Sequence, residues 1–149
     1  MPPRAERLLG TLLACALLVG AHQVPAATFL VATNYVLGSN ETVRTELWLQ
    51  AETVVVQGTT EDDVFLLATA RALGTTGTAP APAIGLDGTM QGDVWALGES
   101  IRLTGSIAEH ARLAGLKTIH VDGSIGRGLM AAANVINIGP RAEIAGDVL

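Results

Sequence analysis

The chain has 149 residues, of which 49% are hydrophobic, 15% charged and 3% aromatic, and its formal net charge is −5. This composition is too apolar and too weakly charged for a disordered protein. The acidic balance argues against a nucleic-acid partner, which would need a basic face. The single cysteine, Cys15, excludes a disulfide scaffold.

The first 26 residues have the order of a secretory signal peptide. Arg4 and Arg7 precede an apolar run over residues 8–21, which is shorter than the roughly 20 residues that span a bilayer, and small residues follow up to Ala26. We expect cleavage after residue 26 and a periplasmic, cell-envelope or secreted location. An uncleaved anchor and lipidation at Cys15, which lies in a loose lipobox-like context, are the competing interpretations.

Residues 27–37 are apolar, and we expect a strand that covers the following domain or caps its first turn. From residue 38 onward the sequence repeats with a period near 17 to 18 residues. Gly92-Asp93-Val94 recurs 54 residues later as Gly146-Asp147-Val148. Apolar columns with the same period are Met90, Ile107, Ile125 and Ile144; Val94, Ala111, Leu129 and Val148; and, upstream, Leu47 to Val64 and Val56 to Leu73.

Within each repeat, apolar residues alternate with polar ones, as in Ile101-Arg102-Leu103, which is the period of a β-strand. Strands this short bury their apolar side only when identical units stack above and below them, and glycines such as Gly105 and Gly123 suit close turns. The sequence therefore predicts an all-β fold, a single-stranded parallel β-solenoid over residues 38–149. Residues 74–87 are expected to form an inserted loop, because Pro80 and Pro82 disfavour a strand there.

Residues 88–149 resemble the bactofilin family of polymer-forming cytoskeletal proteins. The features that carry the resemblance are Gly-Asp-Val at 92–94 and 146–148, Ile-x-Leu-x-Gly at 101–105 and Ile-x-Val-x-Gly at 119–123. The resemblance implies a right-handed three-sided β-helix that polymerises end to end without a nucleotide and has no catalytic residues. The export signal departs from the family, whose typical members are cytoplasmic.

One row of residues, each placed before an apolar column, could gather carboxylates at a corner of the solenoid. The row consists of Glu46, Asp63, Asp93, His110, Gly128 and Asp147. Stacked carboxylates could bind Ca²⁺, but aspartates are also favoured at turns because they accept hydrogen bonds from nearby backbone amides, and we prefer that interpretation. His110 and His120 are expected to point outward, and the sequence indicates no metal site and no cofactor.

A second row contains Trp48, Phe65 and Trp95, followed by Arg112 and Met130. If the alternation holds, these side chains form an outward stripe that could contact sugar rings or another protein. The competing interpretation is that residues 28–37 fold over the stripe and bury it.

The sequence stops at Val148-Leu149, one strand into a new turn. Either the chain is truncated there, or Ile144, Val148 and Leu149 form an assembly surface. We predict a structural, self-assembling protein that is not an enzyme, whose partners are further copies of itself and possible envelope polysaccharides or membrane-associated proteins. The alternative is an extracytoplasmic carbohydrate-binding or polysaccharide-cleaving β-helix, although no acidic cleft with a central basic residue is evident.

Overall fold

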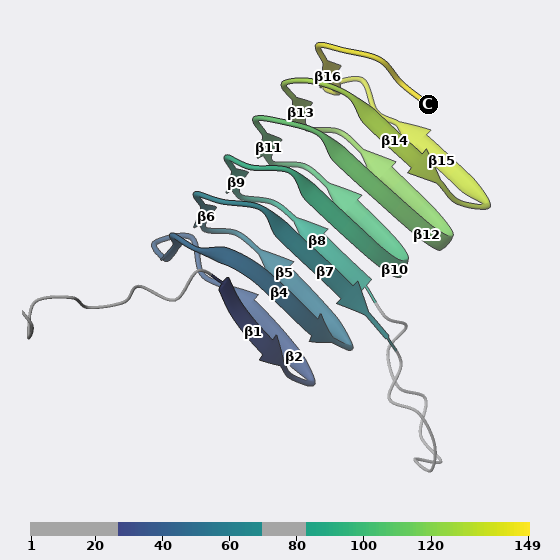
Figure 1. Ribbon diagram of the computed structural model, residues 1–149. Helices are drawn as coiled ribbons and strands as arrows, with labels where there is room; N and C mark the ends of the chain where they lie inside the picture. Colours follow the sequence, from purple (N-terminus) through teal and green to yellow (C-terminus); the bar gives the residue numbers. More distant parts are fainter. Residues whose placement is uncertain (1–26, 70–82) are drawn as a thin grey trace, which may run out of the picture.

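The computed structural model describes residues 27–69 and 83–149, so the expected signal peptide and Cys15 lie outside the described residues. The described residues form β-strands that pair only in parallel and stack as a solenoid of six turns (Figure 1). The predicted all-β solenoid is confirmed. Each turn contributes one strand, or one part of a strand, to each of three columns.

The first column contains β1 (Ala27–Val31), β4 (Glu46–Ala51), β7 (Val64–Ala68), the first part of β10 (Val94–Leu103), the first part of β12 (Ala111–Val121) and β14 (Leu129–Ala132). The second column contains β2 (Asn34–Leu37), β5 (Thr53–Val56), β8 (Ala83–Leu86), the second parts of β10 and β12, and β15 (Val135–Ile138). The third contains β3 (Thr42–Val43), β6 (Thr59–Thr60), β9 (Thr89–Met90), β11 (Ser106–Ile107), β13 (Ser124–Ile125) and β16 (Glu143–Ile144).

The core lies between the three columns, because alternate side chains of each strand point inward. The predicted register is confirmed downstream of residue 88. Met90, Ile107, Ile125 and Ile144 are successive neighbours in the third column. Val94, Ala111, Leu129 and Val148 follow one another in the first column.

The solenoid begins earlier than the sequence predicts. β1 and β2 do not cover the domain, because they pair in parallel with β4 and β5 and so form the first turn themselves. Leu37 enters the core at 4% exposure. The 19-residue step from Thr28 to Leu47 explains why this turn falls outside the 17-to-18 period.

The boundaries of the insertion also differ from the prediction. Residues 83–86 form β8 and not part of a loop, and Ile84 and Leu86 are buried in the core. Val56 therefore pairs with Leu86 and not with Leu73. The insertion enters between β7 and β8, and the expected loop residues 74–82 lie outside the described residues.

Candidate functional site

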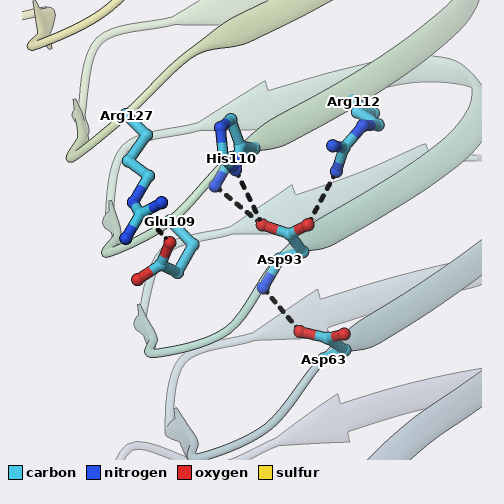
Figure 2. Close-up of polar contacts among 6 residues, drawn as sticks. All are labelled: Asp63, Asp93, Glu109, His110, Arg112 and Arg127. Carbon is cyan, nitrogen blue, oxygen red and sulfur yellow. Dashed lines mark hydrogen bonds and ion pairs between the residues drawn. The ribbon is translucent and has the colours of Figure 1, made fainter.

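The corner before the first column carries a ladder of aspartates (Figure 2). Asp63 precedes β7, Asp93 precedes β10 and His110 precedes β12, so the solenoid register places the three above one another. A carboxylate oxygen of Asp63 accepts a hydrogen bond from the Asp93 amide at 2.8 Å. The Oδ1 atom of Asp93 accepts one from the His110 amide at 3.0 Å. Each aspartate therefore binds the backbone of the next turn.

Asp93 makes two further contacts at this corner. Its Oδ1 atom lies 3.1 Å from Nδ1 of His110, and its Oδ2 atom accepts a hydrogen bond from Arg112 at 2.8 Å. Partial burial alone would raise the pKa of the Asp93 carboxyl, but the hydrogen bonds from Arg112 and His110 together hold this pKa below its usual range. Asp93 is therefore an ionised tie between turns.

Asp93, Glu109 and His110 present potential metal-ligating atoms within 4.8 Å of one another. However, Arg112 is bound to Asp93, and Arg127 pairs with Glu109 at 2.6 Å. Two guanidinium groups at the cluster oppose a divalent cation electrostatically. The contacts therefore favour hydrogen bonding to the backbone over the stacked-carboxylate site that the sequence left open.

Asp122 makes a similar tie at another corner. Arg141 binds the Asp122 carboxylate through its amide and its side chain, and these hydrogen bonds lower the pKa of Asp122. His120 lies in the outward row of the second column, between Arg102 and Asn137.

The outward residues of the first column form a continuous stack. The ring centroids of Trp48 and Phe65 lie 4.0 Å apart with an interplanar angle of 8°. Phe29 stacks on Trp48 at 5.8 Å, and Trp95 stacks on Phe65 at 5.9 Å. The Arg112 guanidinium carbon lies 4.4 Å from the centroid of Trp95 and closes the stack.

We call the outward side of the first column the aromatic face. Beside the ring stack it carries a second outward row, which is Val31, Gln50, Leu67, Leu97, Ala114 and Ala132. A shallow groove of about 680 Å³ runs along this surface. The structure thus brings the predicted stripe residues Trp48, Phe65 and Trp95 together. β1 extends the stripe by one row and leaves Trp48 and Trp95 exposed.

The C-terminal turn leaves core positions open. Ile136 and Ile138 lie in the same inward rows as Ile119 and Val121, yet they are 42% and 50% exposed, whereas Ile119 and Val121 are fully buried. Ile144 is half-buried, and Val148 and Leu149 are exposed beside β14. We call Ile136, Ile138, Ile144, Val148 and Leu149 the end surface.

Sequence reasoning missed members of both surfaces. Phe29 was assigned to a covering strand, and Leu97 was not considered, although each follows from the alternation once the register is known. Ile136 and Ile138 belong to a repeat column that the sequence shows, and their exposure follows from their place in the last turn.

Comparison with known proteins finds no match among protein-family models, curated proteins or solved structures. In the part of the chain that the structure describes, no helix is long and apolar enough to cross a membrane.

Proposed function

We propose that this chain is a structural protein that assembles end to end, in the manner that its resemblance to bactofilins implies. The observation that carries the proposal is the end surface. Burial of apolar area contributes about 25 cal/mol per Å², so a neighbouring molecule that covers Ile136 and Ile138 would supply the burial that the next turn supplies elsewhere in the solenoid.

The backbone supports the same proposal. Among the described strands, β2 and β3 have a parallel neighbour on one side only, and so do β15 and β16. Exposed strand edges with unpaired N–H and C=O groups readily accept further strands. The two ends of the solenoid are therefore suited to hydrogen-bonded contacts as well as apolar ones.

The location and the further partners are also proposals. The order of residues 1–26 supports export, and the resemblance supports a scaffold in the cell envelope. Partners among envelope polysaccharides or membrane-associated proteins are consistent with that location. The structural role that we propose requires no catalysis and no cofactor, since hydrophobic burial and strand pairing drive assembly.

Electron microscopy and sedimentation of the purified chain test the proposal. We expect filaments without added nucleotide, and we expect Ile138→Lys or Val148→Lys to abolish them by placing a charge on the end surface. Leu116→Lys is the matched control, because Leu116 is 69% exposed in a turn away from both ends. Absence of filaments over a wide concentration range, or filaments that persist in both end variants, would contradict end-to-end assembly.

A further inference from the structure

The aromatic face is a second apolar surface, separate from the ends. Phe29 is 73% exposed, and Leu97 and Met130 are also exposed. Among the outward side chains of the face Arg112 alone carries a charge, and it is bound to Asp93. Contiguous apolar surface of several hundred Å² is rare on monomeric proteins and marks an interaction site.

The ring geometry argues against a sugar ligand. Carbohydrate rings stack on the flat faces of aromatic side chains, but both flat faces of Trp48, Phe65 and Trp95 are covered by the next ring or by Arg112. The rings present their edges to solvent. Gln50 supplies the only uncharged polar side chain in the two outward rows, so few groups remain to bind sugar hydroxyls.

The charges that border the face argue against an anionic membrane. The acidic residues beside the first three turns are Glu46, Glu52, Glu61, Asp62 and Asp63, with Arg44 as the described cation at that border. Anionic lipids give membranes a negative surface potential, which attracts basic and not acidic borders.

The same charges favour a second copy in one orientation. Beside the later turns, each acidic side chain is matched by a cation: Arg112 pairs with Asp93, Arg127 with Glu109, and Lys117 with Glu99. A parallel pair of solenoids would bring two acidic halves together. An antiparallel pair places the acidic half of each copy opposite the charge-balanced half of the other, which lowers the repulsion.

We propose that the aromatic face binds the aromatic face of a second copy in an antiparallel, two-fold symmetric pair. Two β-sheets pack face to face at about 10 Å with their side chains interdigitating, and ring edges with aliphatic neighbours suit such packing. The exposed area of about a dozen side chains, several of them aromatic, is on the order of 800 Å² per copy. That is about the share of one partner in a stable interface.

The test uses the full chain with Val148→Lys, so that contact through the end surface is removed and the two kinds of assembly are measured separately. We expect sedimentation equilibrium to show a dimer. In the same background Leu97→Lys or Phe29→Lys should give a monomer, with at least a tenfold weaker association. Val36→Lys is the matched control, because Val36 is 59% exposed on the second column, and it should leave the dimer intact.

Fluorescence gives an independent measurement, since Trp48 and Trp95 are the only tryptophans in the sequence and both lie on the aromatic face. Their emission should shift to the blue as protein concentration rises, and this shift should be lost in Leu97→Lys. A monomer at all concentrations would overturn the proposal, as would a dimer that Leu97→Lys and Phe29→Lys leave unchanged while circular dichroism shows a native fold. A blue shift that requires phosphatidylcholine vesicles or soluble glucan in place of concentration would overturn it in favour of lipid or sugar.

Discussion

Side chains at the corners and in the core of the solenoid join consecutive turns in different ways. Asp63 and Asp93 each bind the backbone amide of the turn that follows. The inward side chains join turns through apolar contact, and the third column is filled by residues such as Met90, Ile107 and Ile125. Each position therefore contributes to two turns, which is why a residue that does not fit affects both.

Thr60 is such a residue, because it lies in the third column directly beside Met90. It is fully buried, and its hydroxyl has no hydrogen-bond partner among the described residues. An unsatisfied buried hydroxyl costs about 1–3 kcal/mol, so we expect Thr60→Val to raise the free energy of unfolding by about 1 kcal/mol or more. Urea denaturation measures this change. Thr59→Val is the control, since Thr59 is only partly buried, and a loss of stability in Thr60→Val would contradict the prediction.

At the scale of the strand and turn, glycines set how closely successive turns approach. A Cβ atom on Gly88 would overlap the carbonyl oxygen of Gly58, one on Gly105 that of Gly88, and one on Gly123 that of Gly105. Those carbonyls accept hydrogen bonds from the turn above, for example from the Ser124 amide to Gly105 at 3.0 Å. A side chain in this column would separate the turns and break these bonds.

We therefore expect Gly105→Ala to lower the free energy of unfolding by about 3 kcal/mol or more, since backbone cannot move aside without disturbing both turns. Gly85→Ala is the matched control. A Cβ on Gly85 would make only ordinary contacts, the nearest at 3.7 Å from Asp87, and alanine is favoured over glycine in a strand by about 0.5–1 kcal/mol. Thermal and urea denaturation of both variants check the pair, and equal effects would contradict the close-approach argument.

The same repeat explains how much could be predicted from the sequence. Gly92-Asp93-Val94 and the isoleucine columns mark the turns after residue 88 clearly, because each turn reuses one corner and one set of core positions. The insertion point could not be found this way. In a chain with 49% hydrophobic residues, Leu73 falls 17 residues after Val56 by chance, and only the structure shows Ile84 and Leu86 in the core.

The candidate surfaces were predicted in part for a related reason. Alternation within the strands placed Trp48, Phe65 and Trp95 in one row, but it could not show that Phe29 continues the row, because the first turn lacks the Gly-Asp-Val mark. Ile144, Val148 and Leu149 were chosen from their position near the last residue of the sequence. The exposure of Ile136 and Ile138 depends on the three-dimensional end of the column.

At the scale of the whole molecule, a solenoid is stabilised by contacts between neighbouring turns, so its stability varies along the axis. The middle turns, which contain β7, β10 and β12, have neighbours above and below. The last turn, with β14, β15 and β16, has described neighbours mainly on one side, and its apolar side chains are partly exposed.

Amide hydrogen exchange at low protein concentration should therefore be slow in β10 and β12 and at least tenfold faster in β15 and β16. End-to-end assembly would supply the missing neighbour, so exchange in β15 and β16 should slow as concentration rises, and Ile138→Lys should remove this protection. Pairing through the aromatic face would act differently, because it leaves the end surface exposed and protects none of these amides directly. Leu97→Lys should therefore leave the concentration-dependent protection of β15 unchanged. Equal exchange rates in the middle and last turns at every concentration would contradict an open C-terminal end.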